Sequence, residues 1–335
     1  MKKFYPTRIL IEKEALEYPL GRQLENKFLA DNMSIEYIES HNRVSPQKQM
    51  SPLQLFKWAK ETLVIGVKKT LRFKSCQPSA DYRLVTTTSC PGKCEYCYLS
   101  TNLGSAVYPR VYVNLTEILK AVKKHIRKAK GEIVTFEASS SSDPIAVEHL
   151  TGTLKETIEY FANQAKGRLR VVTKFAFVDE LLNLEHNGHT KFRFSINPPW
   201  IIKNFEHNTS SLEERIRAAA KIEKAKYPLG FIIAPLIIYH NWKKDYANLL
   251  ATLKDNLAQT TPLTFELIQY RFSTRAKKLI EARFPKTKLK LDKEDYHHQG
   301  FGKYIYPEEK AKKLKSFMEK EIKTNFPKAK IEYFV

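Results

Sequence analysis

The sequence predicts an α/β fold, a partial (β/α)6 barrel of the TIM type. Runs of β-branched and aromatic residues alternate with helical patterns, which is typical of parallel strands joined by right-handed crossovers. Polar side chains follow several of these runs, as they do at the carboxyl ends of barrel strands. No G-x-G-x-x-G motif follows the first run, which disfavours a Rossmann sheet. Six strands are expected at 82–88, 132–138, 169–174, 191–197, 230–235 and 264–270.

Three segments are expected along the chain: an N-terminal α/β extension over 1–75, the barrel core over 76–270, and a basic C-terminal region over 271–335. The extension carries a helical pattern from Pro52 and a strand-like run at 63–67. Apolar residues spaced at i, i+3, i+4 and i+7 predict the helices that separate the strands. Those helices are expected at 115–126, 149–165, 176–184, 210–225, 243–257 and 274–283.

The chain is strongly basic. Its 335 residues include 57 Lys and Arg against 36 Asp and Glu, a formal net charge of +21. Such a charge attracts polyanions, and nucleic acid is the first partner to expect. The alternative is a lysine-rich surface that only keeps the protein soluble. There is no apolar run long enough to span a membrane and no signal region at the N-terminus, so a cytoplasmic protein is expected.

Three of the four cysteines stand together, as Cys90, Cys94 and Cys97 in the spacing C-x3-C-x2-C. Three thiolates can hold three irons of a [4Fe–4S] cluster and leave the fourth iron open. A structural zinc site would normally use four ligands, and a disulfide framework would leave an odd thiol. The pattern therefore favours a cluster, in a loop that follows the first predicted strand.

Other polar residues close the later strands. Glu137 and the segment 139–143 follow the second strand, Lys174 follows the third, and Ser195 and Asn197 end the fourth. We expect these side chains to meet the cysteine loop at the carboxyl edge of the barrel.

Beyond residue 270 the chain is rich in basic, aromatic and glycine residues, a composition typical of a hairpin or an exposed loop. We expect Arg271, Lys303 and Tyr304 to contact a nucleic-acid strand. The alternative is a solvated basic linker followed by a capping strand.

The cysteine loop after the first strand of a (β/α) barrel resembles that of the radical S-adenosylmethionine enzymes. Longer stretches resemble the spore photoproduct lyase family, which repairs the ultraviolet lesion 5-thyminyl-5,6-dihydrothymine in spore DNA. The stretches that carry this resemblance are 18–21, 40–42, 69–73, 90–99, 103–105, 110–115, 191–197, 264–269 and 302–306.

The resemblance implies a [4Fe–4S] cluster whose open iron binds S-adenosylmethionine, and a 5′-deoxyadenosyl radical that takes hydrogen from C6 of the lesion. It implies that Tyr96 and Tyr98 pass the radical back to the adenosyl group. The residues that it places against S-adenosylmethionine are Tyr98, Ser142, Lys174, Ser195, Asn197 and Ala234. It also implies DNA carrying thymine dimers as substrate, an external one-electron reductant of the ferredoxin or flavodoxin type, a monomer, and the spore core as location.

One position departs from the family pattern. A cysteine that quenches the thymine allyl radical usually follows the second strand, and here that position is Ser140. A serine O–H bond is too strong to replace a thiol S–H bond as hydrogen donor. Three explanations stay open: an engineered Cys→Ser exchange, a family member without repair chemistry, or a donor moved elsewhere. We favour the third, with Cys76 as the donor, because it is the one remaining cysteine.

Two rival functions stay open at the level of sequence. One is another radical S-adenosylmethionine enzyme that acts on RNA or a peptide. The other is an iron–sulfur protein that binds nucleic acid without catalysis. Release of 5′-deoxyadenosine separates the second rival from both enzymes, and the defined thymine dimer separates the two enzymes from each other.

Overall fold

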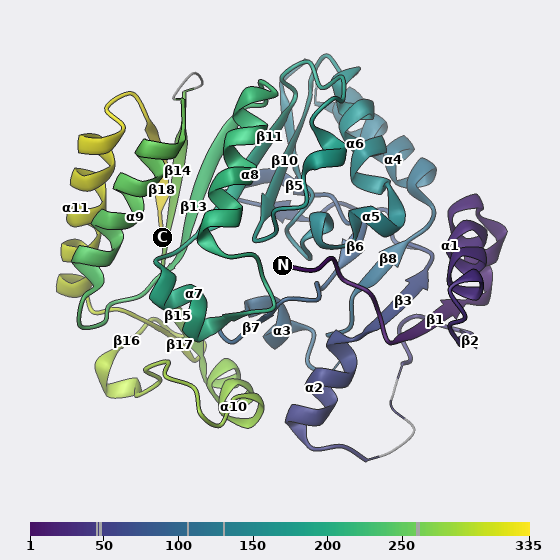
Figure 1. The fold of residues 1–335 in the computed structure, drawn as a ribbon, viewed down its shortest axis with the longest axis horizontal. Helices are drawn as coiled ribbons and strands as arrows, with labels where there is room; N and C mark the ends of the chain where they lie inside the picture. The colour runs from purple at the N-terminus through teal and green to yellow at the C-terminus, as the bar shows by residue number, and fades with distance from the viewer. Residues whose placement is uncertain (45, 47–48, 106, 130, 259–261) are drawn as a thin grey trace.

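The computed structural model describes all residues except 45, 47–48, 106, 130 and 259–261. Its main sheet has eight strands in the order β18-β14-β13-β11-β10-β9-β5-β4 and curves into a half-barrel (Figure 1). All neighbours are parallel except β4 and β5. The predicted partial barrel is confirmed. Its strands are β4 (Ser75–Cys76), β5 (Ala80–Arg83), β9 (Val134–Glu137), β10 (Gly167–Thr173), β11 (Thr190–Ile196), β13 (Leu229–Leu236), β14 (Thr264–Gln269) and β18 (Lys330–Phe334).

Helices cover the outer face of this sheet (Figure 1). They are α4 (Leu115–Lys128), α5 (Glu148–Thr151), α6 (Thr153–Ala162), α8 (Leu212–Lys224), α9 (Trp242–Asn256) and α11 (Glu308–Asn325). The main core lies between helices and sheet, where Phe136, Phe192 and Phe265 are fully buried. Apolar side chains on one face of the strands form one side of this core, and the apolar faces of the helices form the other.

Two predicted helices differ from the structure. The helix expected over 149–165 is divided into α5 and α6, because Gly152 takes a left-handed conformation with φ 63°. The helix expected at 176–184 is wrong, and the crossover contains only the short 3-10 turn η3 (Asp179–Leu181). The buried residues Phe175, Val178 and Leu181 are spaced by three, which is the period of a 3-10 helix rather than of an α-helix.

The strand expected at 82–88 is also divided. Its first half is β5 in the main sheet, and its second half is β6 (Thr87–Thr88) in another sheet. The chain leaves the barrel after β5 because Thr87 and Thr88 pair with β8 (Arg110–Tyr112) instead of with β9. The cysteine loop therefore begins at the junction of two sheets.

That second sheet has five strands in the order β2-β1-β3-β8-β6. It joins β1 (Arg8–Glu12), β2 (Ile35–Ile38) and β3 (Thr62–Gly66) to strands from within the predicted core. The 3-10 turn η1 (Lys13–Glu17) and the helices α1 (Pro19–Ala30) and α2 (Pro52–Lys60) belong to the same part of the chain. Helix α2 begins at a capping box formed by Ser51 and Gln54 and has Pro52 in its first turn.

A third, antiparallel sheet has the order β15-β17-β16. It consists of β15 (Arg271–Ser273), β16 (His297–His298) and β17 (Lys303–Ile305), and the helix α10 (Thr274–Arg283) and the turn η4 (Lys293–Asp295) lie in the same segment. The hairpin expected in this region is present as β16 and β17. None of the helices in the described parts of the chain is long and apolar enough to cross a membrane.

Candidate functional site

The cysteine loop leaves β6 and passes through β7 (Lys93–Cys94) into the short helix α3 (Tyr98–Asn102). Strand β7 pairs with β12 (Glu206–His207), which places Cys94 opposite Glu206. Glu95 fixes the loop further, because its backbone N–H donates to Phe205 at 2.9 Å and its carboxylate contacts His207 at 2.8 Å. The loop is therefore held by β12 and by α7 (Pro199–Phe205), elements that follow the fourth predicted strand.

The loop is also tied to the end of β9. Ser89 has a φ of 58° and its N–H donates to the Ser141 carbonyl at 2.6 Å. The hydroxyl of Ser142 donates to the Ser89 carbonyl. A predicted S-adenosylmethionine contact thus lies directly beside the residue that precedes Cys90.

The three cysteines of the loop are free thiols, and Cys94 is buried. Burial raises the pKa of Cys90 and Cys94, and the neighbouring thiolates raise it further. Within the described residues, no three His, Cys, Asp or Glu side chains are arranged around a single metal ion. A [4Fe–4S] cluster binds each thiolate through a different iron, and three cysteines on one loop are a donor set that suits it.

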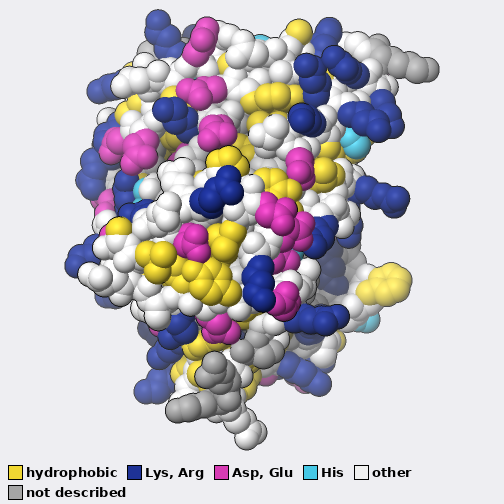
Figure 2. All heavy atoms as spheres, turned by 90° about the vertical axis from the view of Figure 1, so that its right-hand side faces the viewer, with side chains coloured by type: hydrophobic (Ala, Val, Ile, Leu, Met, Phe, Trp, Pro, Cys, Tyr) yellow, Lys and Arg dark blue, Asp and Glu magenta, His cyan; other side chains and the backbone are white. Residues whose placement is uncertain are grey.

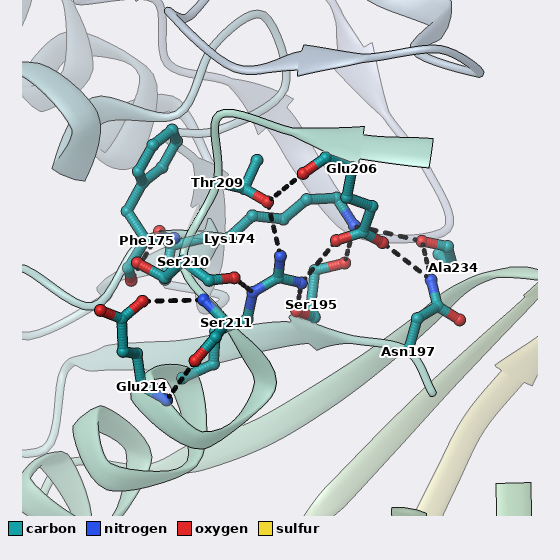
Figure 3. A network of polar contacts seen from close by, with 12 residues as sticks. Lys174, Phe175, Ser195, Asn197, Glu206, Thr209, Ser210, Ser211, Glu214 and Ala234 are labelled. Atoms are coloured by element: carbon teal, nitrogen blue, oxygen red, sulfur yellow. Dashed lines mark hydrogen bonds and ion pairs between the residues drawn. The ribbon is translucent and has the colours of Figure 1, made fainter. Parts of the chain in front are cut away.

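Glu206 is the centre of the polar site beside the loop (Figure 3). Its carboxylate receives hydrogen bonds from Lys174 Nζ at 3.1 Å and from Asn197 Nδ2 at 3.0 Å. Arg215 Nη1 forms an ion pair with it at 2.7 Å, and the Tyr96 hydroxyl donates to it. Four side chains from separate parts of the chain therefore converge on one carboxylate.

Lys174 connects this centre to two more of the predicted residues. Its ammonium donates to Ser195 Oγ at 2.7 Å and to the Ala234 carbonyl at 3.4 Å. Asn197 also donates to the Ala234 carbonyl, at 3.2 Å (Figure 3). Four of the six residues that the resemblance places against S-adenosylmethionine, namely Lys174, Ser195, Asn197 and Ala234, are thus brought together, with the backbone carbonyl of Ala234 as its polar contact.

Glu206 is ionised at neutral pH although it is fully buried. Burial alone would raise its pKa, but the charges of Arg215 and Lys174 and the hydrogen bonds from Tyr96 and Asn197 lower it to about 2. Lys174 therefore faces a carboxylate that stays charged at neutral pH. Glu206 was not predicted, because it lies in a two-residue strand with no pattern of its own.

Asp143 is a second buried carboxylate at this edge. Its Oδ2 accepts from the Lys174 N–H at 2.8 Å and from Thr173 Oγ1 at 3.0 Å. Its Oδ1 has no partner in the described structure although it is shielded from solvent. Burial raises the pKa of Asp143 to about 7. An unpaired acceptor at this place suits a ligand with a hydrogen-bond donor.

Tyr98 and Ser140 are in direct contact. The Tyr98 hydroxyl donates to the Ser140 carbonyl at 2.7 Å, and the buried Ser140 hydroxyl has no partner among the described residues. Loss of solvent raises the pKa of Tyr98, and the nearby thiols of Cys97 and Cys76 contribute to the shift.

Cys76 lies in the edge strand β4 and is half-buried. Burial raises the pKa of its thiol against the opposing charges of Arg83 and Arg193. The turn that follows is anchored by Ser79, whose hydroxyl donates to Glu137 at 2.8 Å and accepts from Arg193 at 2.9 Å. The position of Cys76 thus depends on an ion-pair network inside the barrel.

The predicted nucleic-acid contacts lie together on the third sheet. Arg271 is exposed on β15, and its charge contributes, after burial, to a lowered pKa of Lys303 on β17. The Tyr304 ring stacks on Phe272 at 5.3 Å, and Lys293 Nζ lies 5.3 Å from the Tyr304 ring centre. The role of these residues in binding nucleic acid stays a prediction.

Positive charge by itself does not mark this sheet. Figure 2 shows Lys and Arg side chains spread over another face of the molecule, with Asp and Glu between them. Phe301 is the more distinctive feature, because it is fully exposed at the hairpin tip between Gly300 and Gly302. The sequence analysis expected a hairpin or an exposed loop over this stretch but did not single out Phe301.

Comparisons with known proteins agree along the whole chain. A family model described as spore photoproduct lyase matches residues 4–335. The spore photoproduct lyase of Bacillus subtilis (strain 168) is 49% identical, with 99% of this chain and 98% of the relative covered. The spore photoproduct lyase of Clostridium acetobutylicum is 42% identical, with 98% of each covered.

Solved structures give the same result. A spore photoproduct lyase complexed with dinucleoside spore photoproduct superposes with a TM-score of 0.96 at 44% identity, with all of both chains covered. A mutant spore photoproduct lyase with bound AdoMet (S-adenosylmethionine) and dinucleoside spore photoproduct superposes with a TM-score of 0.95, also over both full chains. In that mutant one cysteine is replaced by alanine and one serine by cysteine.

Proposed function

The chain belongs to the spore photoproduct lyase family of radical S-adenosylmethionine DNA-repair enzymes, and we propose that it converts the spore photoproduct in DNA back into two thymines with Cys76 as hydrogen donor. The observation that carries this proposal is the convergence of the cysteine loop with Lys174, Ser195 and Asn197 at the carboxyl edge of the half-barrel. Chemistry in such barrels takes place at that edge.

Cys90, Cys94 and Cys97 would hold the [4Fe–4S] cluster. The donor set fits, because three thiols share one loop and the chain has no further cysteine beside them. When bound, the cluster supplies the electron that cleaves S-adenosylmethionine to a 5′-deoxyadenosyl radical. Because burial keeps Cys90 and Cys94 protonated in the free protein, loading of the cluster has to release their protons.

Lys174 and its partners would orient the methionyl end of S-adenosylmethionine. The Lys174 ammonium suits the methionyl carboxylate, and the hydroxyl of Ser195 lies 2.7 Å from it as a further donor. Glu206 holds the Lys174 side chain in place through their ion pair. Ser142, Asn197 and the Ala234 carbonyl complete the expected contacts. A relative solved with bound AdoMet supports this role for the site.

Cys76 would quench the thymine allyl radical. The radical takes a hydrogen atom from the S–H bond and leaves a thiyl radical, which then takes a hydrogen atom from a tyrosine O–H bond and restores the thiol. Tyr98 would supply this hydrogen atom and Tyr96 would help to pass the radical back to the adenosyl group; the Tyr98 hydroxyl lies at the usual donor position, where it donates to the Ser140 carbonyl at 2.7 Å. The raised pKa of Cys76 keeps its hydrogen in place at neutral pH. The mutant relative that loses one cysteine and gains another supports the idea of an exchangeable donor position.

The test uses the reconstituted enzyme under anaerobic conditions with dithionite, S-adenosylmethionine and the dinucleoside lesion. The wild type should release 5′-deoxyadenosine and thymine. Cys76→Ala should still consume S-adenosylmethionine but lose most thymine in favour of by-products, and Ser140→Cys in the same background should restore thymine. Unchanged thymine in Cys76→Ala would rule out the donor role, and absence of 5′-deoxyadenosine from the wild type would rule out the whole proposal.

Binding of damaged DNA would use the third sheet. A base inside a duplex has to be extruded before an active site can reach it. Arg271 and Lys303 would hold phosphates, with Tyr304 and the exposed Phe301 beside them. Lys303→Ala should weaken binding to damaged and intact duplexes alike and reduce the salt slope of affinity by about one. A loss confined to damaged DNA would contradict a phosphate role.

A further inference from the structure

Three cations are buried behind the cysteine loop, and within the described residues none of them forms an ion pair with a carboxylate. They are Lys60, Arg110 and Arg283, with exposed fractions of 2%, 7% and 7%. They come from α2, β8 and α10, three elements that are distant in sequence. Such a gathering of like charges in a region of low dielectric constant is unfavourable unless an anion balances it.

Lys60 is the cation nearest to the loop. Its ammonium donates to the Cys90 carbonyl at 2.8 Å and to Ser89 Oγ at 3.2 Å, and both of these partners are neutral. Its Nζ also lies 5.6 Å from the centre of the Phe56 ring. The ammonium is therefore held against the backbone of a predicted cluster ligand.

Arg283 approaches the other end of the loop. Its guanidinium donates to the Ser100 carbonyl at 2.9 Å and to the Gly104 carbonyl at 2.6 Å, and it lies 5.0 Å from the Phe56 ring centre. Lys60 and Arg283 thus flank the same aromatic ring. Arg110 donates to Thr88 Oγ1 at 3.1 Å, and its Nε has no partner in the described structure.

Buried cations elsewhere in the chain form ion pairs with carboxylates. Arg193 is paired with Glu137 and Glu266, and Arg215 with Glu206. The unpaired set is therefore a property of one place rather than of the whole protein. That place is the back of the loop that carries Cys90, Cys94 and Cys97.

We propose that Lys60 and Arg283 are the counter-charges of the iron–sulfur cluster and raise its reduction potential. Three thiolates bring three negative charges, and each electron added makes the assembly more negative by one. Fixed positive charges in a dry environment stabilise the reduced form more than the oxidised form. This inference rests on the proposed function, since it requires a cluster at Cys90, Cys94 and Cys97.

The first measurement is a redox titration of the reconstituted enzyme without S-adenosylmethionine, followed by electron paramagnetic resonance. In Lys60→Met the ratio of reduced to oxidised cluster at a fixed solution potential should fall about tenfold, which is about 59 mV for one electron. Arg283→Met should shift the ratio in the same direction, and Lys60→Arg should retain the wild-type ratio. Lys57→Met is the matched control, because Lys57 lies on the same helix but is exposed.

The second measurement is the unfolding equilibrium of the full chain with and without its cluster. Lys60→Met should leave the cluster-free protein as stable as the wild type or more stable, and should reduce the protection that the cluster confers. An unchanged potential, or an equal loss of stability in both forms, would show a structural lysine and overturn the proposal. A wild type that assembles no cluster would instead refute the proposed function.

Discussion

The inside of the half-barrel and the back of the cysteine loop both contain buried cations, but only the barrel supplies them with carboxylates. Arg193 contacts Glu137 and Glu266, and Arg170 contacts Glu266 and Glu332. Behind the loop, Lys60 and Arg283 donate hydrogen bonds to hydroxyl and carbonyl groups and lie against the Phe56 ring, and neither pairs with a carboxylate among the described residues. A buried cation that pairs with a carboxylate of the same chain stabilises the fold. A buried cation without such a partner indicates that an anionic ligand binds beside it.

The barrel network also has a positional effect. Glu137 receives hydrogen bonds from Ser79 in the turn after Cys76 and, at 3.0 Å, from the N–H of Ser139 beside Ser140. One carboxylate therefore holds both the usual donor position and the proposed one. The ion pairs inside the barrel therefore contribute to the proposed reaction by holding residues 76 and 140 in place, without contacting the lesion themselves.

The largest effect is expected for Arg193→Met, which removes one partner of a buried network. Glu137 would lose its ion pair and Glu266 would lose one of its two ion pairs, so the free energy of unfolding should fall by about 3–5 kcal/mol. Urea unfolding of the cluster-free protein measures the loss. Arg217→Met, an exposed arginine on α8, is the control and should change stability little. An equally small loss of stability in Arg193→Met and Arg217→Met would show that the ion pairs inside the barrel do not stabilise the fold, and the contrast with the region behind the loop would fail.

A somewhat smaller effect is expected from acid. The pKa of Glu206 is lowered from 4.5 to about 2, so its contribution to stability is complete above pH 4.5 and is lost as the pH falls toward 2. The stability difference between the wild type and Glu206→Gln should therefore shrink by about 3 kcal/mol across this window. Glu213→Gln, an exposed neighbour on α8, should show no such change. A constant difference would mean that Glu206 is not held by its cations.

The sequence predicts those parts of the fold and site that have a local pattern. The barrel strands follow from alternating apolar residues, and the cysteine loop and Lys174 follow from their places after those strands. Glu206 could not be predicted, because its importance comes from pairing with Cys94, which is distant in the chain. Lys60 reads as an ordinary lysine in the last turn of a helix, where a basic residue favours the helix dipole. Its burial depends on how α2 packs against the loop.

The smallest effect is expected for Arg283→Met in the cluster-free protein. The change removes two hydrogen bonds to backbone carbonyls, which costs about 1 kcal/mol each, and also removes an unpaired buried charge whose burial costs a similar amount or more. The two terms nearly cancel, so the unfolding midpoint in urea should stay close to that of the wild type. A loss as large as that of Arg193→Met would mean that Arg283 is already satisfied by the chain itself. The region behind the loop would then be a structural core like the barrel, and the need for an anion there would disappear.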